Sequence, residues 1–318
     1  MNEITSRFLP PEDAQRRELH NEVHARPSAR VRLPALIVYV AVLNEGVSRE
    51  QELAHLRLLP GHADLSLERM QGNFMRLRCD HYTVKWERHT EFTRYSIVQS
   101  LPAHALWGSE LPELAAHLAP GTDWLRGLPG QTMAAIHLGM VHADVMASDL
   151  MTKAQAWLGE GAVLASRMGN TTEGLPHSCI LTHFRIGPDG FERMLVLAPE
   201  GTSEARAGRI SQRLLEMETY RLMALRGLPV AKNLSATLSQ AEAQLADITG
   251  LLERKGETDQ ALLDLLVSLA ARIERATAEN GFRFSATRAY DTLVSQRLAE
   301  LRERPISGTQ TLGEFLQR

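Results

Sequence analysis

The stretch that decides how the first half of this chain is interpreted runs Lys85-Trp86-Glu87-Arg88-His89-Thr90-Glu91-Phe92. Strand-forming residues lie on both sides of it, yet most of its own side chains are ionisable. Alternate side chains of a β-strand point to opposite faces, so Glu87, His89 and Glu91 are expected to share one face. Buried charge is costly unless it is paired. The stretch therefore predicts either a solvent-facing strand with cross-strand ion pairs or a polar site built on a sheet.

A second polar box reads Asn21-Glu22-Val23-His24-Ala25-Arg26-Pro27 and follows a helix expected at residues 11–22. The simplest way to satisfy the polar groups of both boxes is to pair them, so we expect the boxes to meet in space. Arg26 would then lie beside a carboxylate of the first box, and His24 beside one of its aromatic rings. The candidate ligand-binding residues are Asn21, Glu22, His24, Arg26, Trp86, Glu87, Arg88, His89 and Glu91.

A divalent metal ion is the candidate cofactor at this meeting point, because imidazole and carboxylate groups suit zinc, manganese or iron. The candidate metal ligands are His24, Glu87 and His89. The alternative is a structural clasp in which Arg26, Arg88 and Arg94 neutralise the carboxylates without a metal. The pattern does not assign a catalytic residue.

Residues 1–200 predict a mixed α/β domain with antiparallel strand pairs. The run at residues 33–43 is rich in β-branched residues and is expected to be a central strand. Ser48 is expected to cap a helix that runs to residue 59. Further strands are expected at residues 74–79, 82–86, 92–99, 132–141, 162–168, 178–185 and 194–198, and a further helix at residues 144–158.

Residues 201–318 predict an all-α hairpin or coiled-coil stalk. Apolar residues recur at alternating steps of four and three at Leu234, Leu238, Ala241, Leu245, Ile248 and Leu252, and again at Leu262, Leu266, Leu269, Ile273 and Ala276. Two such seams joined by a short turn indicate an antiparallel helical hairpin. Asn280-Gly281 is expected to break the second helix before a third, at about residues 285–302. The third helix needs a partner, so we expect self-association into a homo-oligomer.

Composition narrows the classes of function. The chain has 318 residues, 44% hydrophobic residues and a net charge of −3, which suits two globular domains and no nucleic-acid partner. Its two cysteines fit no CxxC pattern and are expected to be reduced thiols in a cytoplasmic protein. No apolar run reaches the length of a membrane span, so the chain as given is expected to be soluble.

Five boxes together resemble a bacterial family of uncharacterised, predicted membrane-anchored proteins that share a domain of unknown function. They are the two boxes above, Glu218-Thr219-Tyr220-Arg221, Phe284-Ser285-Ala286-Thr287-Arg288-Ala289-Tyr290 and Gln310-Thr311-Leu312-Gly313-Glu314-Phe315-Leu316. The resemblance implies that the chain stops before a pair of C-terminal membrane spans. It also implies a place at the cytoplasmic face of the bacterial inner membrane, with that membrane as a partner through segments absent from this chain. The order of elements is similar to that of CorA-type magnesium channels, an analogy at the level of fold.

The predicted fold class is α+β, with a mixed α/β sheet domain at residues 1–200 and a helical hairpin or coiled-coil stalk at residues 201–318. The predicted function is that of the cytoplasmic part of a membrane-anchored protein, with a sensing or assembly role in a channel, transporter or membrane complex. The alternative is a metal-dependent hydrolase that uses the His/Glu cluster. The sequence has no P-loop, zincin motif, nucleophile elbow or dinucleotide fingerprint, which places the enzyme second.

Overall fold

The computed structural model describes residues 10, 12–17, 19, 30–70, 72–102, 118–159, 161–171, 174–253 and 259–317. The fold is mixed α/β, with a sheet built from the N-terminal part and long helices from the C-terminal part, as the sequence predicts. The chain divides into two compact units, which we call the sheet unit (Met1–Gln212 and Arg304–Arg318) and the hairpin unit (Arg213–Glu303). The sequence places this boundary at residue 200, whereas it falls inside helix α6 (Glu204–Leu225).

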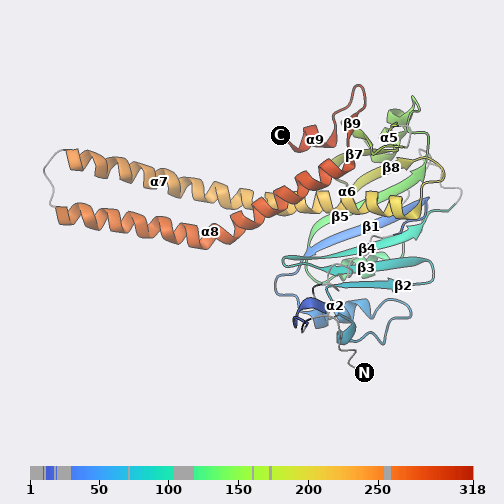
Figure 1. Ribbon diagram of the computed structural model, residues 1–318, viewed down its shortest axis with the longest axis horizontal. Coiled ribbons are helices and arrows are strands. Elements are labelled where there is room, and N and C mark those ends of the chain that lie inside the picture. The colour runs from blue at the N-terminus through green and yellow to red at the C-terminus, as the bar shows by residue number, and fades with distance from the viewer. Residues whose placement is uncertain are drawn as a thin grey trace. The chain divides into compact units, whose positions relative to one another are not determined.

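The sheet unit is built on a nine-stranded sheet in its described residues, with the order β2-β3-β4-β1-β5-β8-β7-β6-β9 (Figure 1). Neighbouring strands are antiparallel, except that β5 and β8 run parallel. The strands are β1 (Ala35–Leu43), β2 (Phe74–Arg78), β3 (Tyr82–Arg88), β4 (Phe92–Ser100), β5 (Gln131–His142), β6 (Leu164–Met168), β7 (Ser178–Ile186), β8 (Glu192–Ala198) and β9 (Arg304–Pro305).

Strand β1 lies inside the sheet because its sequence can be buried on both faces. Its first eight residues are buried, and it pairs along its whole length with β4 on one side and β5 on the other. A strand that is apolar on both faces is typical of a sheet covered on both sides. The expected central strand at residues 33–43 is therefore confirmed.

One face of the sheet carries the main apolar core, to which Leu36, Val38, Trp86 and Tyr95 contribute. Short helices pack on this core: α2 (Arg49–Leu56), the 3₁₀ helix η1 (Leu67–Met70), α4 (Thr122–Arg126) and α5 (Leu150–Leu158). Ser48 caps α2 as predicted, and its hydroxyl accepts from the backbone N–H of Gln51 while the Gln51 side chain accepts from the Ser48 N–H. This reciprocal pair satisfies two amide groups that would otherwise lack partners at the start of α2.

The C-terminal residues after the helices return to the sheet unit. Strand β9 pairs with β6, and α9 (Leu312–Leu316) begins at Thr311, whose hydroxyl accepts from the backbone N–H of Glu314. The backbone N–H of Leu312 donates to the buried Ser166 hydroxyl at 3.2 Å. The last predicted box, at residues 310–316, therefore forms a capped helix beside β6.

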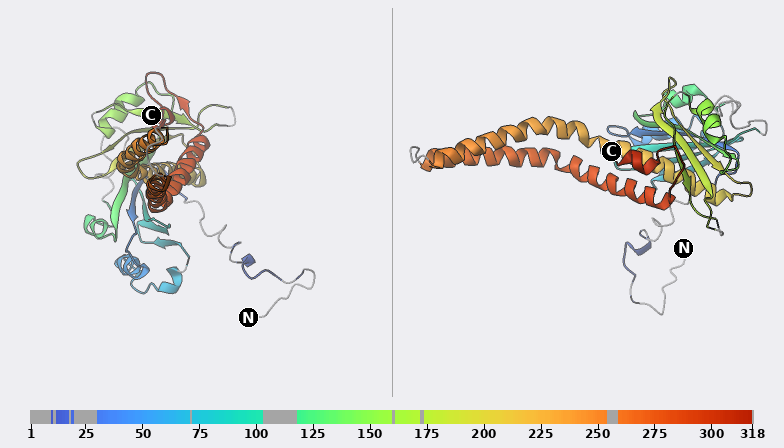
Figure 2. Two further views of the ribbon diagram at one scale, coloured as in Figure 1. Left: turned by 90° about the vertical axis from the view of Figure 1, so that its left-hand side faces the viewer. Right: turned by 90° about the horizontal axis from the view of Figure 1, so that it is seen from above.

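The hairpin unit contains α7 (Gly227–Glu253) and α8 (Asp259–Leu301), which lie side by side (Figures 1 and 2). The predicted helical hairpin is thus confirmed. The predicted break at Asn280-Gly281 is wrong, because α8 continues through both residues. The side-chain amide of Asn280 donates to the carbonyl of Ala276 at 2.8 Å, one turn earlier. A glycine inside a helix costs only about 1 kcal/mol, which the helical residues on both sides offset.

Candidate functional site

The first polar box forms the end of a strand and a turn, not one continuous strand. Strand β3 ends at Arg88 and β4 begins at Phe92, so residues 89–91 form the turn between them. The expectation that Glu87, His89 and Glu91 share one face is therefore wrong, because strand alternation stops at the turn. The His89 ring stacks on the Phe92 ring at 4.4 Å between centroids. The backbone carbonyl of Glu91 accepts from the backbone N–H of Asn44 at 3.1 Å.

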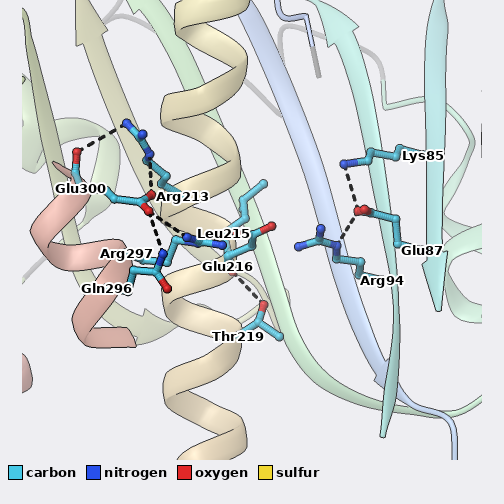
Figure 3. Close-up of polar contacts among 10 residues, drawn as sticks. All are labelled: Lys85, Glu87, Arg94, Arg213, Leu215, Glu216, Thr219, Gln296, Arg297 and Glu300. Carbon is cyan, nitrogen blue, oxygen red and sulfur yellow. Dashed lines mark hydrogen bonds and ion pairs between the residues drawn. The ribbon is translucent and has the colours of Figure 1, made fainter. Parts of the chain in front are cut away.

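Glu87 is the centre of a buried ionic triad on β3 and β4 (Figure 3). Its Oε2 atom lies 3.0 Å from Lys85 Nζ and 2.5 Å from Arg94 Nε. Glu87 is 1% exposed, Lys85 6% and Arg94 4%. Register explains the geometry, since Glu87 lies directly opposite Arg94 and two residues from Lys85 on the same strand face.

The two cations determine the charge state of the Glu87 carboxyl. Burial acts to raise its pKa, but the attraction and hydrogen bonds of Arg94 and Lys85 outweigh burial and lower the pKa to about 2. Glu87 is therefore ionised at any ordinary pH. An anion already matched by two cations has little left with which to attract a metal ion. This is the neutralisation that the clasp alternative describes, with Arg94 as the arginine that contacts Glu87.

Arg88 has a different partner, on the opposite face of the sheet. Its Nη1 atom lies 2.8 Å from Oε1 of Glu52, a fully buried carboxylate on α2. The Thr93 hydroxyl donates to the same oxygen at 2.6 Å, and Arg88 also donates to the carbonyl of Val47 at 2.8 Å. The sequence did not predict Glu52 as a site residue. The sequence could have indicated Glu52 through its position, because this carboxylate lies next to Leu53 on the face of α2 that packs on the core.

Of the other predicted site residues that the structure describes, Trp86 does not belong to the Glu87 cluster. Trp86 is fully buried in the core beside its cross-strand neighbour Tyr95. Asn21, Glu22, His24 and Arg26 lie outside the described residues, so the meeting of the two boxes stays a prediction. Among the residues that the structure does describe, no group of three or more His, Cys, Asp or Glu side chains is placed to hold a metal ion.

Two other predicted boxes do come together, within the hairpin unit. The rings of Tyr220 on α6 and Tyr290 on α8 stack at 5.9 Å between centroids. The Thr287 hydroxyl donates to the carbonyl of Ala224 at 3.2 Å, and a Cβ atom on Gly227 would lie only 2.4 Å from that hydroxyl oxygen. Gly227 is therefore required for this close approach between the start of α7 and the middle of α8.

Ion pairs join α6 and α8 near the end of α8 (Figure 3). Arg297 Nε lies 2.6 Å from Glu216 Oε2, and Arg213 Nε lies 2.9 Å from Glu300 Oε2. Arg297 also contacts Glu300, at 3.1 Å. These charges are satisfied by one another, so they fix the helices and do not mark a reactive centre.

The surface of the hairpin differs from these satisfied clusters. Only alternate members of the predicted seams are buried between α7 and α8, namely Ala241, Ile248, Leu262 and Leu269. Five of the other members are between 38% and 56% exposed, and we call them the hairpin stripe: Leu238, Leu245, Leu252, Leu266 and Ile273. Within each helix the stripe residues are seven positions apart. The described helices contain no segment that is both long and apolar enough to cross a membrane.

Comparison with protein families gives a match over residues 11–318 to a model described as "Protein of unknown function (DUF3422)". Neither the curated proteins nor the solved structures gave a match. The analogy with CorA-type channels therefore stays a prediction.

Proposed function

We propose that this chain, which belongs to the DUF3422 family of proteins of unknown function, is an assembly protein whose hairpins associate with one another. Two hairpins would meet through their stripes and form a four-helix bundle. The observation that carries the proposal is the exposed stripe of Leu238, Leu245, Leu252, Leu266 and Ile273. Exposed apolar side chains that repeat along one pair of helices in this way are typical of an interaction site.

The period of the stripe indicates the kind of partner. Apolar residues seven positions apart pack against another helix of the same period, through knobs that enter holes on the facing helix. A second copy of the hairpin supplies this period on both of its helices. A twofold pair is also self-complementary, because each copy presents the same patch.

Burial of the stripe between two copies would contribute a free energy comparable with the cost of association. Burying the five half-exposed stripe residues on each of two copies would contribute roughly 8–15 kcal/mol, from about 1.5–3 kcal/mol for each fully buried side chain. This is similar in size to the cost of association, which is about 4–15 kcal/mol.

Membrane anchoring, a place at the cytoplasmic face of the bacterial inner membrane, and a role in a channel or transporter complex belong to the same proposal. They rest on the resemblance of the five boxes. The metal-dependent hydrolase is the weaker alternative, because Glu87 is already held by Lys85 and Arg94.

The test is to replace Leu245 and Leu266 together with Asp in the whole chain and to measure the molar mass by light scattering. Both residues lie in the stripe and not in the buried seam, so the variant is expected to keep its helical circular dichroism and to lose its self-association. A matched control replaces Ser239 and Ser268, which are exposed residues of the same helices, with Asp. A wild-type chain that stays monomeric at high concentration would contradict the proposal.

A further inference from the structure

The seam between α7 and α8 is filled at one end and hollow at the other. Ile248, Leu262 and Leu269 fill it toward the turn. Toward the start of α7, the facing positions carry Thr237, Ala276 and Asn280. These side chains are too short to fill the space between two helices, and protein interiors do not close such gaps without strain.

A hollow of about 330 Å³ results, lined mainly by apolar side chains that include Leu238, Ile273 and Phe284. A second hollow of about 400 Å³ shares Leu234, Thr237, Arg272, Ala276 and Asn280 with the first. The second hollow is more polar, since Asn233, Arg275 and Glu279 also line it. The two hollows are therefore adjacent and differ in polarity.

The size of the apolar hollow indicates what fits in it. A water molecule occupies about 30 Å³ of liquid, so 330 Å³ has room for roughly eleven groups of the size of water or a methylene. A leucine side chain from another helix has only four carbon atoms. A single side chain of a second copy would therefore leave most of the hollow empty, whereas an alkyl chain of about ten carbons would fill it.

Arg272 gives the hollow its charge preference. It is the one charged residue among the described residues that line the apolar hollow, and it lines the polar hollow as well. Its Nη1 atom donates to the exposed Gln244 Oε1 at 2.6 Å, and this partner is neutral. A guanidinium at the border of an apolar hollow favours a carboxylate, which it can hold through two hydrogen bonds.

We propose that the hairpin binds a single-chain amphipathic carboxylate of the fatty-acid class. The alkyl chain lies in the hollow between Leu238, Ile273 and Phe284, and the carboxylate lies at Arg272. This site shares Leu238 and Ile273 with the stripe, whereas Leu245, Leu252 and Leu266 of the stripe do not line it. Substitutions at Leu245 and Leu266 therefore test the assembly function without changing the lining of the hollow.

The test is to titrate the whole protein with dodecanoate, below its micelle concentration, by isothermal titration calorimetry. Binding is expected for the wild type. Ala276→Leu fills the hollow and is expected to abolish binding, whereas Ala278→Leu, on the exposed side of the same helix, is expected to leave it unchanged. Because Ala276→Leu adds apolar contacts at an under-packed position, its melting temperature is expected to stay the same or rise.

A second pair of variants tests the charge. Arg272→Gln is expected to weaken dodecanoate binding about tenfold and to leave dodecanol binding unchanged, since only the acid carries a carboxylate. Arg288→Gln, an exposed arginine of α8 that lines neither hollow, is the control. Equal loss for the acid and the alcohol would show that Arg272 acts only through packing and would contradict the proposal.

Two outcomes overturn the proposal outright. One is that the wild-type protein binds no dodecanoate at millimolar concentration and that the monomeric double variant, Leu245→Asp with Leu266→Asp, binds none either. The other is binding by that monomeric variant alone, which would show that a second copy covers the hollow. Molar mass is measured separately, so failure of the ligand site is distinguishable from failure of the assembly function.

Discussion

In the sheet unit charged side chains are buried, whereas in the hairpin unit leucine side chains are exposed. Glu87, Lys85 and Arg94 are each at most 6% exposed, while Leu238, Leu245 and Leu252 are each 47% or more exposed. A soluble protein usually shows the opposite distribution. The buried charges of the sheet unit satisfy one another, whereas the described residues of the hairpin leave these leucines exposed. The sheet unit therefore needs no partner to satisfy its charges, and the hairpin has an apolar surface that a partner can cover.

This comparison also separates stability from function. The Glu87 triad and the Glu52–Arg88 pair hold strands and α2 together, so their loss should destabilise the sheet unit. Loss of the stripe should leave each unit folded and change only what the hairpin binds. The experiments below test this separation, with the four tryptophans as a convenient probe, because all lie at positions of the sheet unit.

The largest effect is expected from Glu87→Gln. The change leaves Lys85 and Arg94 buried without their anion and should lower the free energy of unfolding by about 3–5 kcal/mol. Urea unfolding followed by tryptophan fluorescence measures this in the sheet unit. Glu45→Gln, at an exposed turn before α2, is the control and should change stability by less than about 0.5 kcal/mol. A Glu87→Gln effect as small as the control's would show that the triad is not a clasp.

The next effect compares a buried residue of the seam with an exposed one. Ile248→Ala removes a side chain that is 4% exposed and should lower the stability of the hairpin by about 2–4 kcal/mol. Leu245→Ala, three positions away and 50% exposed, should cost the isolated hairpin fold less than about 1 kcal/mol. Helical circular dichroism during urea unfolding, measured at a dilution where the chain is monomeric, compares the two. Equal losses would mean that the stripe is part of the hairpin core.

A smaller effect is expected where α7 begins. Gly227→Ala places a Cβ atom 2.4 Å from Thr287 Oγ1 and should destabilise the hairpin unit by about 1–3 kcal/mol through overpacking. The added change Thr287→Ala should restore part of the loss. Gly250→Ala is the matched control on α7, where the space is open, and should stabilise the helix by about 1 kcal/mol. Thermal unfolding followed by helical circular dichroism ranks the melting temperatures of the three variants.

The smallest effect is a pH dependence of the sheet unit. Burial and the nearby positive charge of Arg206 lower the pKa of His177 from 6.5 to about 4. The unfolded chain then binds a proton between these two pH values and the folded protein does not, so stability should fall as the pH drops from about 6.5 to about 4. The loss should be on the order of 1–2 kcal/mol after solvent screening. His177→Gln should flatten the profile measured by tryptophan fluorescence, whereas His81→Gln, at an exposed turn, should not.

The sequence by itself determined the local elements. The β-branched run of β1, the Ser48 cap of α2 and the two apolar seams of the hairpin all depend on residues close together in the chain. Their periods are consequences of backbone geometry, so they can be counted without knowing the fold. The helix that continues through Asn280-Gly281 is the exception, because two weak helix formers are outweighed by the long helical segments around them.

Only the tertiary structure decided which polar groups meet. Arg88 contacts Glu52 rather than Glu87, because α2 packs on the face of the sheet to which Arg88 points. Arg94 contacts Glu87, because the register of β3 and β4 places them opposite each other. The structure alone also shows that each seam is only half buried. Periodicity tells which residues share a face, but burial depends on how many other elements reach that face, and the hairpin offers each helix one neighbour along the seam.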